Sequence, residues 1–385
     1  MSTSSLIYFD ADPMNPWVAD IYRAFSLSEE MAEMDIRLTT YHGHALAHPD
    51  DVFLPTRAAP AGVITDYEPR WRRCLHANIP CVLLNQVLPR DCRAGERVVR
   101  SDYLKMGEQA AEVLLARGVA NLAFLGCGNR GNPTMELKRK GFERKIGEGE
   151  GTLVEIPSFA HDQRWLTPQA VDQLAAWFRT APKSLAVAAV NIYFAWGAWK
   201  ALKLAGRRLP EEVLLLAVGD DPVLLEMASP SVSGIPENST EIGRVCARDL
   251  RALIDGERTP CETLIAPLRV VHRDSTARVF SEDPVVARAL AYMRDTLAEN
   301  PSMDEIARHA FVSRATLLRR FREHRGRTPS AELAQLRVEH AIDLILHTDQ
   351  SFAAIADAAG YGLQSALSRA IRQATGKTPT ELRRR

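Results

Sequence analysis

Residues 302–333 read SMDEIARHAFVSRATLLRRFREHRGRTPSAEL, and residues 351–383 read SFAAIADAAGYGLQSALSRAIRQATGKTPTELR. The second stretch repeats the first, because Ile306-Ala307 returns as Ile355-Ala356 and the closing GRTP returns as GKTP. Each copy has the pattern of a helix, a tight turn and a second helix. Two copies are too few for a helical solenoid, so the repeat predicts a tandem helix-turn-helix domain.

The second helix of each copy carries side chains suited to DNA. Such a helix fits the major groove, where arginine can donate two hydrogen bonds to guanine and glutamine can pair with adenine. Leu317, Leu318 and Phe321 predict the buried face of the first copy, as Leu367 and Ile371 do for the second. The outward candidates are Arg314, Ala315, Arg319 and Arg322 in the first copy, and Gln364, Ser365, Ser368 and Arg369 in the second.

Charge is uneven along the chain, although the whole sequence has 48 basic and 48 acidic residues. Residues 282–385 carry 16 Lys and Arg against 13 Asp and Glu, and Arg314–Arg327 holds six arginines with Glu323 as its single acid. A local basic stripe is typical of phosphate contact, and a solvated helix face is the alternative. Arg325 and Arg327 are expected to contact phosphate, so their loss should weaken binding to all sequences similarly.

The first 275 residues alternate short apolar runs with amphipathic segments. Strands that alternate with helices predict parallel, doubly wound sheets, in which ligands bind beyond the carboxyl ends of the strands. The predicted strands are LIYFDA (6–11), AGVITD (61–66), IPCVLLN (79–85), NLAFLG (121–126), SLAVAAV (184–190), VLLLAVG (213–219) and TLIAPLRVV (263–271).

Strand patterns cease near residue 277, which predicts a change of domain. We assign a ligand-sensing α/β domain to residues 1–277, a linker to 278–284 and an all-α DNA-binding domain to 285–385. Within the last domain, the helix-turn-helix units are expected at about 303–324 and 352–374.

Residues 284–385 resemble the DNA-binding domain of the AraC/XylS family of transcription regulators. The resemblance rests on the two repeated stretches and on LRVEHAIDLIL (336–346), which joins them. Matching the family's base-contacting positions implicates Ala315, Leu318 and Arg319 in the first unit and Gln364, Ser365, Ser368 and Arg369 in the second.

The preceding part is similar to the ligand-binding core of the lac/galactose repressor family and of periplasmic sugar-binding proteins. The resemblance rests on residues 101–126, 138–143, 190–221 and 229–257. It implies a two-lobed, periplasmic-binding-protein-like fold and a sugar pocket that includes Asp10, Asp12, Lys138, Asn191 and Asp221. Here Lys138 replaces the family's usual arginine, and Ile192 stands where an acid is usual. The combined domains resemble the xylose-regulator class of transcription factors.

Three other patterns have competing interpretations. Gly126–Gly131 spells G-x-G-x-x-G, but the acid that a dinucleotide site needs about 20 residues later is not at the end of a strand. His42, His44 and His48 lack an acidic or thiol partner in register, which favours solvated histidines over a metal site. The tryptophans that could stack on a sugar ring, or belong to the core or surface, are Trp17, Trp165 and Trp196.

Composition limits the remaining classes of function. The N-terminus lacks a basic region before Asp10, and no apolar run approaches the roughly 18–20 residues of a membrane span, so a cytoplasmic protein is expected. The six cysteines have no C-x-x-C pair and are expected to be reduced. No nucleophile elbow, H-E-x-x-H or P-loop occurs in the sequence, which favours a regulator over an enzyme.

The sequence therefore predicts a cytoplasmic, ligand-responsive transcription regulator without a cofactor. Its expected partners are double-stranded operator DNA, a sugar or sugar-like effector, a second copy in a homodimer and, for an activator, RNA polymerase; no membrane partner is expected. The alternative is a sugar-metabolism enzyme with a fused DNA-binding tail.

Overall fold

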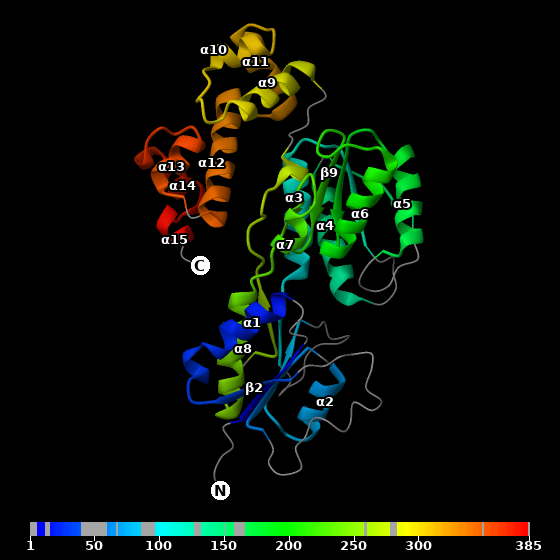
Figure 1. Cartoon of the computed structure of the whole chain (residues 1–385), viewed down its shortest axis with the longest axis vertical. Helices are drawn as coiled ribbons and strands as arrows, with labels where there is room; N and C mark the ends of the chain where they lie inside the picture. The colour runs from blue at the N-terminus through cyan, green and yellow to red at the C-terminus, as the bar shows by residue number, and fades with distance from the viewer. Residues whose placement is uncertain are drawn as a thin grey trace.

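The computed structural model describes most of the chain as two α/β lobes and a helical domain (Figure 1). The described residues are 6–11, 16–39, 60–66, 68–85, 97–126, 132–149, 151–157, 166–257, 260–277, 283–348 and 350–383.

The first lobe is a parallel six-stranded sheet in the order β11-β5-β4-β3-β1-β2. Strands β3, β4 and β5 are buried along their whole length, as expected for a parallel sheet covered on both faces. The strands are β1 (Leu6–Asp10), β2 (Asp35–Thr39), β3 (Gly62–Thr65), β4 (Cys81–Leu84), β5 (Val98–Ser101) and β11 (Glu262–Ile265). The helices are α1 (Pro16–Ser26), η1 (Glu29–Met31), α2 (Glu68–His76) and α8 (Ser239–Ile254).

The second lobe is a parallel five-stranded sheet in the order β10-β9-β8-β6-β7. Its central strands β8 and β9 consist entirely of buried apolar residues. The strands are β6 (Asn121–Leu125), β7 (Thr152–Leu153), β8 (Leu185–Ala189), β9 (Val213–Ala217) and β10 (Ser233–Gly234). The helices are α3 (Tyr103–Ala116), α4 (Pro133–Gly147), α5 (Pro168–Thr180), α6 (Ile192–Ala205), α7 (Pro222–Glu226) and η2 (Asp274–Thr276).

The chain passes between the lobes three times. It leaves the first sheet after β5 to enter α3, returns between β10 and α8, and leaves again after β11. The last crossover was predicted as one strand over 263–271, but only its first part pairs in the first sheet. Val271 instead makes an antiparallel bridge to Gly234 in the second lobe. Residues 266–272, which follow β11, therefore connect the two lobes, and we call this segment the strap.

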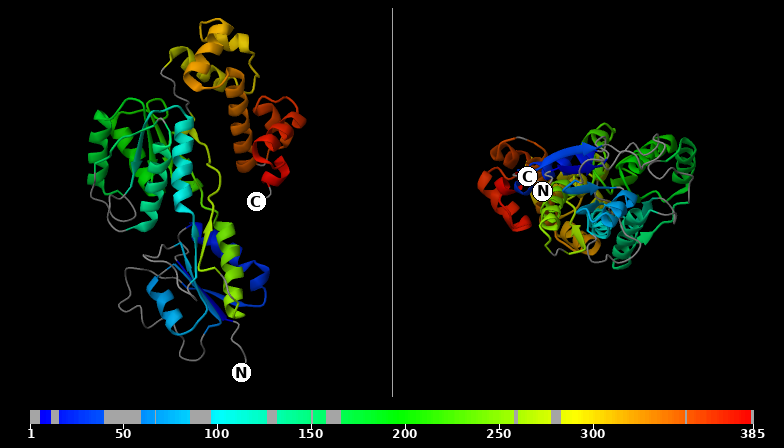
Figure 2. Two further views of the ribbon diagram at one scale, coloured as in Figure 1. Left: turned by 180° about the vertical axis from the view of Figure 1, so that it is seen from behind. Right: turned by 90° about the horizontal axis from the view of Figure 1, so that it is seen from below.

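The helical domain contains the two predicted helix-turn-helix units, joined by α12 (Figure 2). Leu333 and Leu336 of α12 pack in the core of the first unit, whereas Ala341 and Ile345 pack in that of the second. The helices are α9 (Pro284–Asp295), α10 (Met303–His309), α11 (Arg314–Arg325), α12 (Pro329–His347), α13 (Phe352–Ala358), α14 (Gln364–Thr375) and α15 (Pro379–Arg383).

The repeat in the sequence is also a repeat of backbone geometry. Gly326 and Gly376 end α11 and α14 with φ values of 66° and 73°. The tight turns contain Phe311 at φ 59° and Gly360 at φ 73°. In each unit, therefore, a residue in the left-handed conformation follows the first helix and another follows the second. Three of these four residues are glycine, which commonly ends helices in this conformation.

Candidate functional site

Two predicted pocket residues lie just past the carboxyl ends of neighbouring strands. Asn191 follows β8 and accepts a hydrogen bond from the backbone N–H of Phe194 at 2.9 Å. Asp221 follows β9 and accepts one from the N–H of Leu224 at 3.1 Å. Each side chain therefore caps the helix that follows its strand, so its oxygen is held at the edge of the sheet where a doubly wound fold binds ligands.

Lys138 joins the same edge from helix α4. Its buried Nζ donates to the backbone carbonyls of Val218 at 2.8 Å and Val190 at 3.3 Å. Burial lowers the pKa of Lys138, although the negative charge of Glu237 opposes that shift. An ammonium has three N–H donors, so two carbonyls leave one donor for a further acceptor.

A polar cluster connects the two lobes here, and Lys138 is the member that the sequence analysis predicted. We define the inter-lobe cluster as Asn85, Ser101, Tyr103, Lys138 and Glu237. Oε2 of Glu237 accepts from Ser101 Oγ at 2.5 Å and from Asn85 Nδ2 at 3.1 Å. The Tyr103 hydroxyl donates to the Asn85 carbonyl at 3.2 Å, and Lys138 Nζ lies 5.4 Å from the Tyr103 ring centre.

The members of the inter-lobe cluster come from both sides of the crossovers. Asn85 directly follows β4 and Ser101 ends β5, both in the first sheet. Tyr103 and Lys138 belong to second-lobe helices, and Glu237 lies between β10 and α8. Burial and the charge of Glu237 raise the pKa of Tyr103 well above its usual value, against the effect of Arg100, so its hydroxyl stays a donor. The signal in the sequence was Asn85, the polar residue that closes the predicted strand 79–85.

The other predicted ligand residues are only partly described. Asp10 is the last residue of β1, but its side chain lies outside the described residues, as does all of Asp12. Trp196 stacks on Trp199 with ring centres 5.0 Å apart, and Trp17 packs against the first-lobe core. Trp165, His42, His44 and His48 and the residues after Gly126 in the glycine-rich loop lie outside the described residues. Within the described ranges, no group of three or more His, Cys, Asp or Glu residues could hold a metal ion.

The outward and inward faces of α11 and α14 are those that the sequence predicts, except that Leu318, expected on the buried face, is only partly buried. Leu317, Phe321, Leu367 and Ile371 are buried. Seven of the DNA candidates are exposed, namely Arg314, Ala315, Arg319, Arg322, Gln364, Ser365 and Arg369, while Leu318 and Ser368 are partly exposed. The side chains at the start of each second helix are therefore accessible, as major-groove recognition requires.

Arg325 joins the helical domain to the second lobe, and its predicted phosphate contact stays a prediction. Its side chain is only 8% exposed, and Nη2 donates to Glu332 at 3.2 Å and to the backbone carbonyl of Ala116 at 3.0 Å. Arg327 also pairs with Glu332, whose side chain is buried. A buried acid needs charged partners, so Glu332 holds both cations, and Arg325 lies at a contact with the second lobe.

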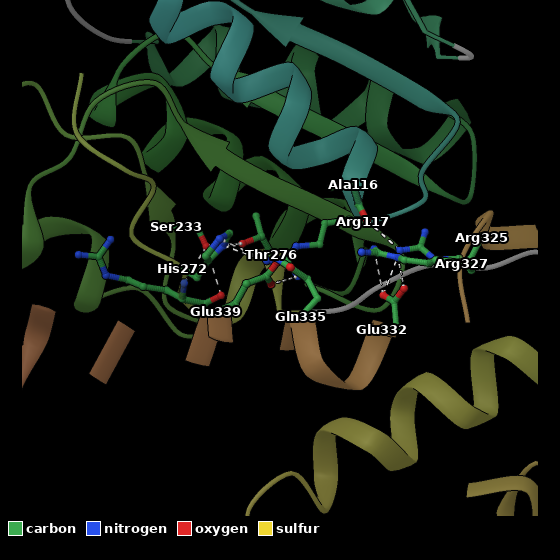
Figure 3. A network of polar contacts seen from close by, with 11 residues as sticks. Ala116, Arg117, Ser233, His272, Thr276, Arg325, Arg327, Glu332, Gln335 and Glu339 are labelled. Carbon is green, nitrogen blue, oxygen red and sulfur yellow. Dashed lines mark hydrogen bonds and ion pairs between the residues drawn. The ribbon is translucent and has the colours of Figure 1, made fainter. Parts of the chain in front are cut away.

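Arg117, at the end of α3, is the centre of an interdomain network (Figure 3). Its Nη1 lies 3.0 Å from Oε2 of Glu339 on α12, and its Nη2 lies 3.0 Å from Nδ1 of His272 on the strap. Gln335 donates to the other oxygen of Glu339 at 3.0 Å. One guanidinium thus contacts the second lobe, the strap and the helical domain.

Two family models match the chain, and they match different parts of it. The model for a periplasmic binding protein-like domain matches residues 111–276, and the model for a helix-turn-helix domain matches residues 306–385. The first range covers most of the second lobe and the strap, and the second covers most of the tandem repeat.

Several known proteins are similar to this chain in sequence. The xylose operon regulatory protein of Haemophilus influenzae is 24% identical over 290 residues, which are 74% of each chain. That of Escherichia coli is 24% identical over 289 residues, or 74% of this chain and 73% of the other. A putative AraC-like transcription regulator of Streptomyces antibioticus is 37% identical over 102 residues, which are 26% of this chain and 34% of that protein.

Solved structures share the fold. The structure of the xylose-binding transcription activator XylR has a TM-score of 0.60 at 20% identity, covering 98% of this chain and 97% of that one. A LacI family regulator from Enterococcus faecalis with bound ribose has a TM-score of 0.54 at 17% identity, covering 71% of this chain and 99% of that one.

The fold, the site and these relatives define the class: the chain is a ligand-responsive, DNA-binding transcription regulator that joins a periplasmic-binding-protein-like domain to a helix-turn-helix domain. Within that class it is most fully matched, among the proteins described above, by the xylose operon regulators. The regulator names of these relatives favour this function over the enzyme alternative. None of the described helices is both long and apolar enough to cross a membrane.

Proposed function

We propose that this regulator senses a pentose or a related sugar between its two lobes and controls carbohydrate-utilisation genes in the cytoplasm. In this proposal residues 1–277 are the sensor, 278–284 the linker and 285–385 the DNA-binding domain. The chain acts as a homodimer on operator DNA and contacts RNA polymerase if it activates transcription. The names of the xylose operon relatives and the ribose-bound structural neighbour support a sugar effector.

The observation that carries the proposal is the position of Lys138, Asn191 and Asp221. Lys138 is bonded to the carbonyls of Val190 and Val218, the residues directly before Asn191 and three before Asp221. An ammonium, an amide and a carboxylate thus lie along one sheet edge, and such groups match the donors and acceptors of sugar hydroxyls. We assign Asp10 and Asp12 to the same pocket from the first lobe.

A panel of pentoses, hexoses and polyols tests the effector by thermal shift. A ligand that binds only the native state raises the melting temperature, and the increase grows with ligand concentration. We expect D-xylose or a close relative to give the largest increase. If no member of the panel changes the melting temperature, the sugar assignment is wrong.

Three variants test the pocket residues by titration calorimetry with the active sugar. Lys138→Met keeps an unbranched chain but removes the donor, so it is expected to abolish binding. Asp221→Ala and Asn191→Ala should weaken binding and also cost about 1 kcal/mol of stability as lost helix caps. Arg251→Ala, on the far first-lobe helix α8 in an exposed pair with Asp255, is the control. Unchanged affinity in all three variants would remove these residues from the pocket.

A further inference from the structure

Helices α3 and α4 form one tightly packed unit. A Cβ added to Gly107 of α3 would lie 1.9 Å from the backbone oxygen of Lys138, and one added to Gly141 of α4 would lie 2.0 Å from that of Leu104. The two backbones therefore touch, and neither helix can slide on the other without a clash.

This unit extends from the inter-lobe cluster to the helical domain. Tyr103 begins α3 and Lys138 lies on α4, and both belong to the inter-lobe cluster. Fourteen residues of helix span about 21 Å, and at the other end Ala116 and Arg117 contact the helical domain. Figures 1 and 2 show α3 running along the second lobe between these two places.

The strap reaches the same end of α3 from the first lobe. Gln109 of α3 donates to the Leu268 carbonyl at 3.1 Å, and His272 follows four residues later at Arg117. The strap begins at β11 of the first sheet and contacts α3 of the second lobe. A change in the angle between the lobes must therefore shift the strap relative to α3.

We propose that Arg117 couples effector binding to the DNA-binding domain through its simultaneous contacts with Glu339 of α12 and His272 of the strap. The inference rests on the proposed function and names its route of regulation. In the structure described here, Arg117 and Arg325 hold α12 and the end of α11 against the second lobe. Closure of the lobes on a sugar moves the strap and His272, weakens the Arg117–Glu339 pair and releases the helical domain to a second orientation. The two orientations bind DNA with different affinity, as differential binding requires.

The test compares DNA affinity of the full chain with and without D-xylose, on a duplex selected by the wild-type protein at fixed salt. Coupling between sites is typically about 5–150-fold in affinity. Arg117→Ala is expected to reduce this ratio to less than about twofold and to bind DNA without sugar as the wild type does with it. Glu339→Gln should do the same, while Arg251→Ala should behave as wild type. A wild-type ratio in Arg117→Ala overturns the proposal.

Hydrogen exchange without any sugar separates this inference from the identity of the effector. Arg117→Ala is expected to speed exchange in residues 335–343 of α12 and to leave exchange in α14 unchanged. If the wild type responds to no sugar, but Arg117→Ala changes both α12 exchange and DNA affinity, the effector assignment fails and the contact keeps its controlling role. If hydrogen exchange in α12 is the same in Arg117→Ala as in the wild type, the Arg117–Glu339 contact does not restrain α12, and the proposal is wrong.

A second inference rests on Leu363, the N-cap residue directly before the recognition helix α14. Leu363 is 67% exposed and makes no side-chain capping bond, whereas Ser313, the N-cap residue of α11, accepts from the N–H of Thr316 at 3.2 Å. Leucine is among the poorest residues at an N-cap position, so Leu363 stabilises α14 less than a serine at the same position would. An exposed apolar side chain beside the exposed Gln364 and Ser365 lies where a recognition helix meets base edges.

We infer that Leu363 contacts the methyl group of a thymine in the half-site bound by α14, because that methyl is the apolar feature of the major groove. The inference depends on the proposed binding to DNA. Replacing each thymine of the selected duplex by deoxyuridine, one at a time, removes single methyl groups.

The wild type is expected to lose about fourfold in affinity at one such position, the equivalent of ~0.8 kcal/mol for a buried methyl-sized group. Leu363→Ser, which restores a cap, should bind all the duplexes without that loss, and Leu27→Ser, which removes an exposed leucine of the first lobe, should retain it. The same fourfold loss in Leu363→Ser overturns the inference. If the wild-type chain binds no duplex, the proposed function is wrong, and so is the inferred contact between Leu363 and a thymine methyl group.

Discussion

Nη1 of Arg319 lies 2.9 Å from Oε1 of Glu323, one turn further along the recognition helix α11. Arg319 is the candidate base reader of the first unit, so in this state its guanidinium is bound to an acid of its own helix. The equivalent arginine of the second unit, Arg369, has Gln373 at the matching position. The two recognition helices are therefore similar in fold and different in charge.

Glu323→Gln should strengthen DNA binding. The substitution removes a negative charge that competes for Arg319 and repels phosphates, so we expect affinity to rise several-fold at low salt and the gain to shrink as salt is added. Fluorescence anisotropy at three salt concentrations measures this. Affinity equal to or below that of the wild type would show that Glu323 does not restrain Arg319.

Arg369→Ala should cost about 1–3 kcal/mol on the selected site and relax preference at one base pair. Arg319→Ala should cost less than Arg369→Ala, because Arg319 must first leave Glu323. Binding of both variants to a library of single-base changes at fixed salt decides between base and phosphate contact. Uniform weakening on every sequence would identify Arg369 as a phosphate contact.

Gly107→Ala should destabilise the second lobe, because the new Cβ would lie 1.9 Å from the Lys138 backbone oxygen. Overpacking of this kind costs about 1–3 kcal/mol. Gly147→Ala is the matched control at the end of α4, where an added Cβ meets nothing within 4 Å and alanine favours the helix. Urea denaturation of both variants measures the difference, and equal stability would contradict the close packing of α3 and α4.

His272 should make stability depend on pH. Burial and the charge of Arg117 lower its pKa from 6.5 to about 4, against the opposing charges of Glu339 and Asp343. The unfolded chain then binds a proton below about pH 6.5 that the folded chain refuses until about pH 4. Stability is complete above that window and falls by at most about 3 kcal/mol as the pH decreases through it. His272→Gln should remove this part of the pH dependence in urea titrations, and an unchanged profile would disprove the assignment.

The tandem repeat made the helical domain predictable because its signals are local. The starts of α11 and α14, their buried residues and the closing glycines all follow from spacing within about twenty residues. The strand ends that carry Asn191 and Asp221 were also predictable, since uninterrupted apolar runs mark buried parallel strands.

Contacts between distant segments were not predictable in this way. Glu237 meets Asn85 and Ser101 across more than a hundred residues, and the short strands β7 and β10 depend on their neighbours for pairing. Arg325 was assigned to phosphate because its surroundings in sequence are basic. Its partners in the structure, Glu332 and the Ala116 carbonyl, become adjacent only in the folded chain.

The central claim is that a sugar in the sensor changes how the tandem helices bind DNA. The most direct measurement is the affinity of the full chain for a duplex selected from a random library, at fixed salt, with and without D-xylose and the other sugars of the panel. We predict salt-dependent binding in the unliganded state and a change of at least about fivefold with one sugar. Absence of salt-dependent binding, or equal affinity with every sugar that raises the melting temperature, would contradict the account.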